Sequence, residues 1–163
     1  MEEKHILSIL VDNEPGVLSR IVGLFSGRGY NIDSLSVAET TDPEISRITM
    51  ITTADRVIIE QIKKQLHKLV NVIKVYDLTD QKYVQRELAL IKVHAKSENR
   101  AEILRIVDIF RSKVVDVGID HFTIEISASI EKLEAFLMLL KPMGIMEIVR
   151  TGSVVIGRNN LKD

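Results

Sequence analysis

The sequence predicts an α+β fold made of two similar units in tandem, each an antiparallel sheet covered on one face by two helices. Two observations support this prediction. The 163-residue chain repeats the order strand, helix, strand, strand, helix, strand, and a polar connector at residues 79–82 separates the two copies. We therefore expect an N-terminal domain over residues 1–79 and a C-terminal domain over residues 80–163.

Apolar runs and helical periodicity define the elements of the first half. Residues 5–11 form an almost continuous apolar run, which is typical of a buried strand. After the turn at residues 12–16, apolar residues recur at helical spacing through Phe25, and Asn13 is predicted to cap this helix. The remaining elements are hairpin strands at residues 31–40 and 45–53, a helix over residues 58–70 and a strand at residues 72–78.

The second half repeats this order with signals of its own. Residues 122–128 alternate between apolar and polar side chains, which is the clearest strand pattern in the chain. Ser129 precedes a helical pattern and is predicted to cap it. The other elements are strands at residues 87–95 and 114–117, helices over residues 101–110 and 133–140, and a final strand or pair of strands at residues 145–149 and 154–156. Each half thus has the βαββαβ order of a ferredoxin-like sandwich.

The composition restricts the classes of function. With 45% hydrophobic and 28% charged residues, the chain is expected to be a soluble globular protein. Its 22 basic and 23 acidic residues nearly cancel, so no surface for nucleic acid or anionic membranes is predicted. The absence of cysteine excludes disulfides, thiolate metal sites and cysteine nucleophiles. Because no apolar run is long enough for a signal peptide or a membrane span, we expect a cytoplasmic protein.

The turn at residues 12–16 is the strongest candidate for a binding site. It joins a strand to a helix, and the first backbone N–H groups of a helix bind anions such as a carboxylate. Gly16 allows a ligand to approach the backbone closely, and the amide of Asn13 can donate and accept hydrogen bonds. An amino acid would fit this chemistry, although the same residues also suit a purely structural helix start.

A second segment joins this candidate site only if two chains pair. The strand at residues 31–40 follows the first helix, so it lies at an edge of a βαββαβ sheet, and an exposed edge is commonly paired or covered. In a homodimer paired at this edge, Asn31 of one chain would face the turn at residues 12–16 of the other. The candidate site is therefore expected at a dimer interface.

Over nearly its whole length, the sequence resembles the regulatory, or small, subunits of acetohydroxyacid synthase (AHAS), also called acetolactate synthase, which begin with an ACT domain. The matching stretches are residues 6–8, 13–20, 23–35, 46–49, 65–70, 86–88 and 149–152. The resemblance implies a non-catalytic subunit that activates a separate large subunit and makes it sensitive to valine in branched-chain amino acid synthesis. The large subunit would hold thiamine diphosphate, Mg²⁺ and FAD, and this chain would hold no cofactor.

The resemblance also implies which residues bind the amino acid. In this family, valine occupies the interface between two ACT domains. One protomer would contribute Asn13, Gly16, Val17 and Leu18, with Glu14 as a neighbour, and the other would contribute Asn31 and Ile32. The N-terminal domain would sense the amino acid and dimerise, and the C-terminal domain would couple binding to the catalytic subunit. The choice among valine, leucine and isoleucine stays open.

Three other functions known for this architecture fit the residues less well. An acylphosphatase-like enzyme needs an arginine in the first turn to bind phosphate, whereas Asp12 and Glu14 would repel it. A metal chaperone would need a Cys-x-x-Cys pair. A ligand-responsive transcription factor would need a helix-turn-helix segment, which this sequence lacks. The four histidines fall in different predicted elements, which argues against a shared metal or catalytic site.

Overall fold

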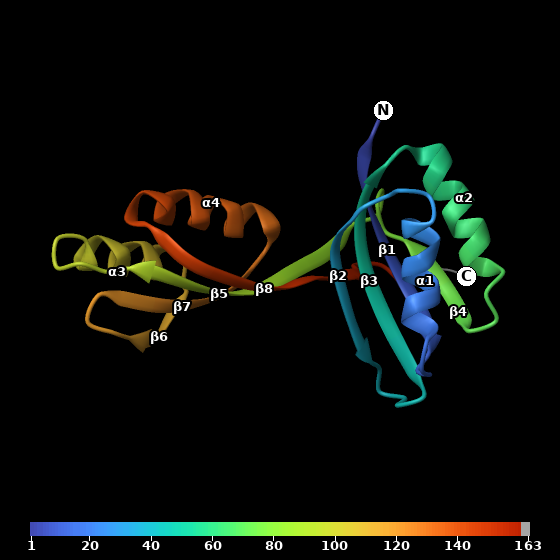
Figure 1. Ribbon diagram of the computed structural model, residues 1–163, viewed down its shortest axis with the longest axis horizontal. Helices are drawn as coiled ribbons and strands as arrows, with labels where there is room; N and C mark the ends of the chain where they lie inside the picture. The colour runs from blue at the N-terminus through green and yellow to red at the C-terminus, as the bar shows by residue number, and fades with distance from the viewer. Residues whose placement is uncertain (161–163) are drawn as a thin grey trace. The chain divides into compact units, whose positions relative to one another are not determined.

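The computed structural model describes residues 1–160, which form two four-stranded sheets with two helices each (Figure 1). The first set of elements is β1 (Glu3–Asp12), α1 (Val17–Ser26), β2 (Ile32–Glu39), β3 (Ile45–Ala54), α2 (Arg56–His67) and β4 (Val72–Asp77). The second set is β5 (Tyr83–His94), α3 (Arg100–Ile109), β6 (Lys113–Val117), β7 (His121–Ala128), α4 (Ile130–Leu140), a short 3₁₀ turn η1 (Lys141–Met143) and β8 (Ile145–Gly157). The predicted tandem of ferredoxin-like βαββαβ sandwiches is confirmed.

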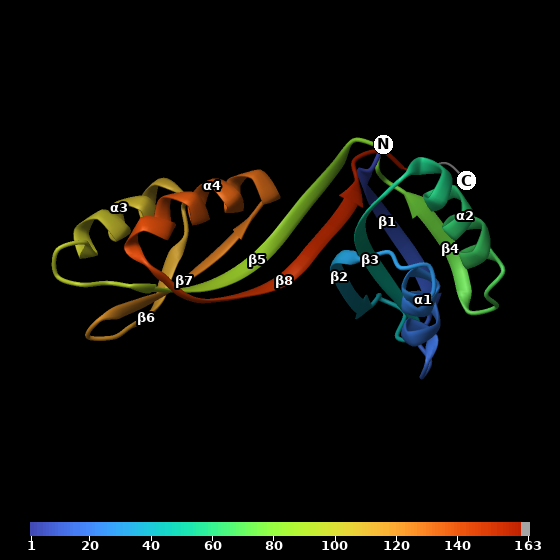
Figure 2. The same cartoon turned by 45° about the horizontal axis from the view of Figure 1, so that its top comes forward.

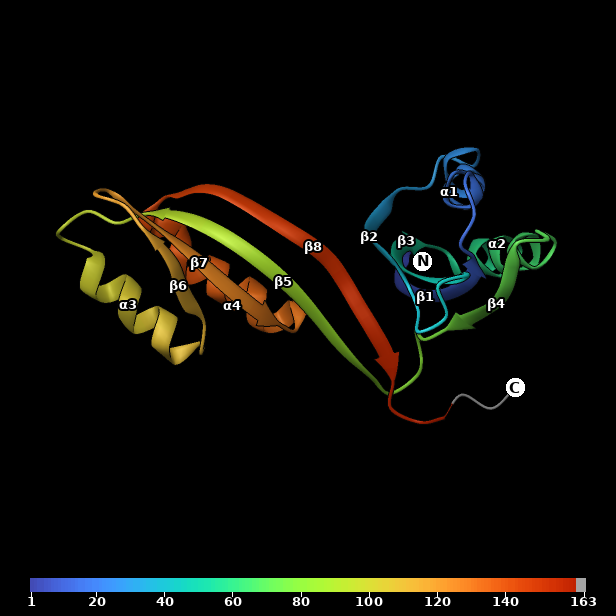
Figure 3. The ribbon, with the colours of Figure 1, turned by 90° about the horizontal axis from the view of Figure 1, so that it is seen from below.

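The first sheet has the strand order β2-β3-β1-β4, so β2 and β4 are its edges. β1 lies antiparallel to β3 and to β4, and α1 and α2 cover one side of the sheet (Figure 3). Alternate residues of the central strands, including Leu7, Ile9 and Met50, face the helices and pack with Phe25 in the core. This alternation explains why every second residue of the apolar run at residues 5–11 is apolar, since those residues face the helices.

The opposite face of the first sheet is also buried. Its buried residues are Ile6, Ser8, Thr49 and Ile51, none of which is more than 8% exposed. The C-terminal part of β8 covers part of this face, because the backbone N–H of Ser153 donates to the hydroxyl of Ser34 at 2.8 Å and Val155 is buried. Consequently, residues 153–160 group with residues 1–84 in one compact unit, and residues 85–152 form the other.

The domain boundary expected between residues 79 and 80 therefore agrees only in part with the limits of the two compact units. β5 and β8 are neighbours in the second sheet, and an end of each belongs to the first unit. They run antiparallel, since the backbone N–H of His94 donates to the carbonyl oxygen of Gly144 and the backbone N–H of Arg158 donates to that of Lys82. We call residues 83–84 and 153–157 the terminal ribbon. β8 is one continuous strand, which decides between the two alternatives left open by the sequence.

The second sheet has the order β6-β7-β5-β8, and α3 and α4 lie on the same side of it (Figure 2). Its core includes Ala89, Ile91, Val93, Phe122, Ile124, Ile126, Ile103, Leu133 and Phe136. Ser129 caps α4 as predicted, because its hydroxyl accepts from the backbone N–H of Lys132 at 3.4 Å. Among residues 1–160, no helix is long and apolar enough to cross a membrane, and no three potential metal ligands are grouped together.

A largely buried ion pair joins β5 to β8 in the second unit. The guanidinium of Arg150 donates to both carboxylate oxygens of Glu87, at 2.6 and 3.0 Å. This hydrogen bonding raises the pKa of Arg150. The Glu87 side chain is 4% exposed, whereas that of Arg150 is 40% exposed. Burial therefore removes water mainly from the Glu87 carboxylate, and the two hydrogen bonds from Arg150 compensate for that loss.

Arg150→Met is expected to lower the free energy of unfolding by about 1 to 3 kcal/mol, because the buried Glu87 carboxylate loses that donor. The partial exposure of Arg150 keeps the expected loss below the ~3 to 5 kcal/mol typical of fully buried pairs. Urea denaturation measures the change. The double variant Glu87→Leu with Arg150→Met should recover most of the loss. Equal stability of Arg150→Met and the wild type would contradict this expectation.

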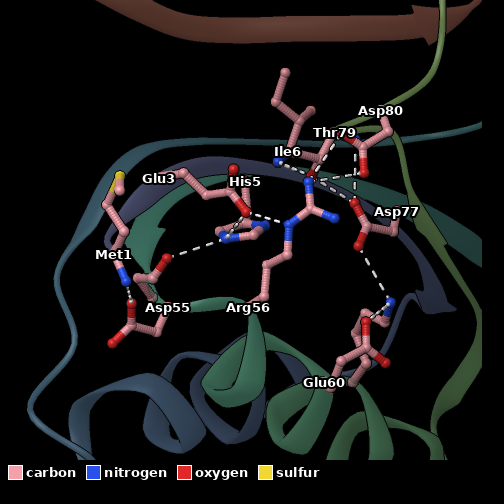
Figure 4. Close-up of polar contacts among 12 residues, drawn as sticks. Met1, Glu3, His5, Ile6, Asp55, Arg56, Glu60, Asp77, Thr79 and Asp80 are labelled. Carbon is pink, nitrogen blue, oxygen red and sulfur yellow. Dashed lines mark hydrogen bonds and ion pairs between the residues drawn. The ribbon is translucent and has the colours of Figure 1, made fainter.

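A charged cluster fixes the start of α2 to β1 and to the connector after β4, and Figure 4 shows Arg56 between Glu3 and Asp80. The Arg56 guanidinium hydrogen-bonds to Glu3 and, at 3.2 Å, to Asp80. The hydrogen bond to Arg56 holds the pKa of Glu3 below its usual value. Beneath them, His5 is buried, with Nε2 3.1 Å from the carbonyl oxygen of Ala54. His5 thus has a packing role, in line with its isolated position in the sequence.

Asp77, at the end of β4, makes the stability of the first unit depend on pH. Its carboxylate accepts hydrogen bonds from the backbone N–H and the hydroxyl of Thr79, at 3.1 and 2.5 Å, and from Lys63 at 3.1 Å. Burial raises the pKa of Asp77, but these hydrogen bonds outweigh it and hold the pKa below its usual value. This stabilisation is complete above the unfolded-state pKa of about 3.9 and is lost as pH falls through the lower folded-state pKa.

We therefore expect Asp77→Asn to lower the free energy of unfolding at pH 7, and the difference from the wild type to shrink as the pH falls below about 4. Urea denaturation at a series of pH values measures both effects. The matched control is Glu44→Gln, which removes one carboxylate from an exposed turn of the same unit. A loss of stability in Asp77→Asn that stays constant down to the most acidic pH would refute the role assigned to the carboxylate.

Candidate functional site

The turn between β1 and α1 leaves free space beside its backbone. β1 ends at Asp12, which pairs with Ile45 of β3, and α1 begins at Val17. Gly16 is the N-cap residue of α1 and has the left-handed conformation, with φ 84° and ψ −9°. This conformation favours glycine, while a Cβ atom at Gly16 would meet nothing within 4 Å. Gly16 therefore sets the backbone direction and leaves free space at the start of the helix.

Asn13 does not cap α1, so that prediction is wrong. Its Nδ2 donates to the carbonyl oxygen of Pro43 at 2.9 Å, and its backbone N–H donates to that of Glu44 at 2.8 Å. The physical reason is that Asn13 is bound to the turn between β2 and β3, while the helix starts only at Val17. Asn13 thus fixes the position of the loop and leaves the helix amides uncovered.

The first turn of α1 presents backbone amides without a side-chain cap. The N–H of Val17 reaches the carbonyl oxygen of Glu14 at 3.4 Å, and the N–H of Arg20 begins the helical pattern by donating to Gly16 at 3.1 Å. Within residues 1–160, no side chain caps the amides between them, those of Leu18 and Ser19. Such amides, together with the helix dipole, attract an anion.

A polar network that sequence analysis missed supports the turn. Asn71, between α2 and β4, donates from Nδ2 to Asp12 at 3.2 Å and to Glu14 at 3.3 Å, and its Oδ1 accepts from Arg20 at 2.8 Å. Arg20 lies one helical turn after Gly16, so helical periodicity could have placed it near the site. Asn71 carries no local signal, because it reaches the turn only through the pairing of β4 with β1.

The two apolar residues predicted to contact the ligand differ in accessibility. Val17 is buried in the core, so it can meet a ligand only through its backbone N–H. Leu18 is 37% exposed and lies in the uncapped first turn of α1. Leu18 is therefore the apolar side chain of this turn that a ligand could contact.

Asn31 and Ile32 lie far from the turn within one chain. Ile32 pairs with Thr52 of β3, which pairs with His5 near the start of β1. The turn follows Asp12 at the other end of β1, so the two places are seven residue steps apart along the strand, about 23 Å. A single chain therefore brings together the predicted residues from 13 to 18 but not those at 31 and 32.

Both units match families of known proteins. Residues 7–74 match the AHAS small subunit-like ACT domain, and residues 86–159 match the small subunit of acetolactate synthase. The acetolactate synthase small subunit of Aquifex aeolicus is 52% identical, over 95% of this chain and 81% of that protein. The acetolactate synthase isozyme 3 small subunit of Escherichia coli is 44% identical, over 96% of this chain and 97% of that protein.

A solved structure agrees with these sequence matches. The crystal structure of the acetolactate synthase small subunit from Thermotoga maritima superposes with a TM-score of 0.86 and 42% identity. The match covers 98% of this chain and 99% of that one. The chain belongs to the family of acetolactate synthase small subunits.

Proposed function

We propose that this chain is a non-catalytic subunit that activates an acetolactate synthase large subunit and confers feedback inhibition by valine. The observation that carries the proposal is the similarity of both units to acetolactate synthase small subunits, together with the uncapped start of α1 in the ACT domain. The catalytic reaction would take place on the large subunit, which would hold thiamine diphosphate, Mg²⁺ and FAD. This chain would supply the amino acid sensor.

The chemistry of the turn supports an amino acid as the ligand. The valine carboxylate would accept hydrogen bonds from the uncapped amides of Leu18 and Ser19, close to Gly16. The ammonium group would lie near the side-chain amide oxygens of Asn13 and of the second chain's Asn31. The isopropyl group would contact Leu18. Each part of the ligand thus has a partner of matching chemistry.

The strand register supports a site shared between two chains. β2 is an edge strand, and its exposed Val37 is an apolar side chain that pairing would cover. Glu39, at the end of β2, pairs with Ser46, which pairs with Val11 next to the turn. Antiparallel pairing of two β2 strands about a two-fold axis would place the second chain's Ile32 near Glu39 of the first. The predicted residues would then meet at the turn.

The proposal is tested by mixing the purified chain with its large subunit and measuring acetolactate formation from pyruvate at increasing valine concentration. We expect a higher rate than with the large subunit alone, and inhibition by valine that requires this chain. Parallel titrations with leucine and isoleucine identify the preferred amino acid. Acetolactate formation by this chain alone, or an unchanged rate and valine response of the large subunit, would refute the proposal.

A further inference from the structure

The face of the first sheet opposite its helices carries Arg47, which has no ion-pair partner among the described residues. Strand register places three rows of side chains on this face: Ser34, Ile51 and Ile6; Ser36, Thr49, Ser8 and Tyr76; and Ala38, Arg47, Leu10 and Lys74. The three rows contain two cationic side chains and no carboxylate. Arg47 therefore has no acidic neighbour within its own row.

Both cationic side chains extend toward one aromatic ring. Arg47 and Lys74 flank Leu10 in the same row, and Arg47 Cζ and Lys74 Nζ lie 6.0 and 5.0 Å from the ring centre of Tyr76. Arg47 Nη1 donates to the hydroxyl of Ser8 at 2.7 Å. Among the described residues, no carboxylate forms an ion pair with Arg47. Most of its five N–H donors thus remain available to a ligand.

A cavity of about 370 Å³ lies beside this group, entirely within the first unit. Arg47 and Tyr76 line it, the buried Leu78 and Val155 form an apolar part of its wall, and Asn159 adds a side-chain amide. This volume is within the range of about 300 to 1,000 Å³ found for small-molecule sites. The cavity combines apolar contact area with a few polar groups, which is the usual composition of such a site.

We propose that this cavity binds a small organic anion whose phosphate or carboxylate group pairs with Arg47. The guanidinium fork matches either group in a bidentate geometry. The hydrocarbon part of the ligand would contact Leu78 and Val155. The site is distinct from the proposed valine site, because it lies on the sheet face opposite α1 and needs no second chain.

Nuclear magnetic resonance titration of the full-length ¹⁵N-labelled chain tests this site, with inorganic phosphate and propionate as separate probes at constant ionic strength. We expect saturable shifts confined to β3 near Arg47, to β4 near Tyr76 and to residues 155–160. Arg47→Gln should weaken binding about tenfold or more, because a charge-assisted hydrogen-bond pair is lost. Arg47→Lys, which keeps the charge but loses the fork, should bind with intermediate affinity.

The matched control is Arg105→Gln, which removes the same charge from an exposed position on α3 and should leave the titration unchanged. Thermal unfolding of each variant establishes that it is folded. Tighter binding of phosphate or of propionate identifies which anionic group the site prefers. Shifts that do not saturate with either probe, or titrations that are identical in the wild type and Arg47→Gln, would overturn the proposal. Because valine takes no part in the titration, its result is independent of the proposed regulatory function.

Discussion

Gly16→Asp is expected to abolish valine binding, with a loss of affinity of about 100-fold or more. The new carboxylate would stand at the uncapped start of α1, where the valine carboxylate is proposed to bind. It would repel the ligand and compete for the same backbone amides. The fold should survive, because nothing lies within 4 Å of a Cβ atom at this position and aspartate tolerates the left-handed conformation better than most residues.

Gly16→Ala is the matched control for this substitution. It brings the same Cβ atom into the same left-handed backbone, but no charge. Calorimetric titration with valine should therefore show a much smaller loss for alanine than for aspartate, and circular dichroism should show that both variants are folded. Valine affinity in Gly16→Asp equal to that of the wild type would remove α1 from the binding site.

Excision of the second unit is expected to separate valine binding from valine inhibition. In this variant a short Gly-Ser linker replaces residues 85–152, so that both strands of the terminal ribbon are retained. We expect the variant to bind valine and dimerise, because both proposed surfaces lie in the first unit. We expect inhibition of the large subunit to be lost, since coupling requires an element whose states differ in affinity for valine and the second unit is proposed to be that element.

The design of the excision follows from the burial of the open sheet face. A chain cut after Thr79 would lose the terminal ribbon and expose part of the face that contains Ile6 and Ile51. Such a truncation would confuse instability with loss of coupling. Acetolactate formation is measured against valine concentration with the wild type and the excised variant. Identical inhibition curves would mean that the second unit does not transmit the signal.

The elements of the fold could be predicted from the sequence because their signals are local. The alternation at residues 122–128 and the serine before α4 determine one strand and one helix start within a few residues. The terminal ribbon could not be predicted in the same way. It depends on pairing between β5 and β8, which lie about fifty residues apart in the chain, and on burial of the sheet face opposite α1 and α2.

The candidate site, like the fold, could be predicted only where the signals in the sequence are local. Gly16 could be identified because a strand, a turn and a helix meet there, and its left-handed backbone agrees with that analysis. The role of Asn13 could not be deduced, because its partner Pro43 belongs to a turn thirty residues away. Asn71 was missed for a similar reason, since only the packing of the folded unit brings it to Asp12 and Glu14.

A mixed-dimer experiment tests most directly the central claim that valine binds between two chains. Gly16→Asp damages the turn of one protomer, and Asn31→Ala damages the contribution of the other, so each variant alone should bind little valine. In a heterodimer of the two variants, one site carries both substitutions and the other carries neither. After random exchange, the mixture should recover about a quarter of the wild-type binding capacity at wild-type affinity. No recovery in folded, fully exchanged dimers would contradict the shared site and with it the proposed mechanism of regulation.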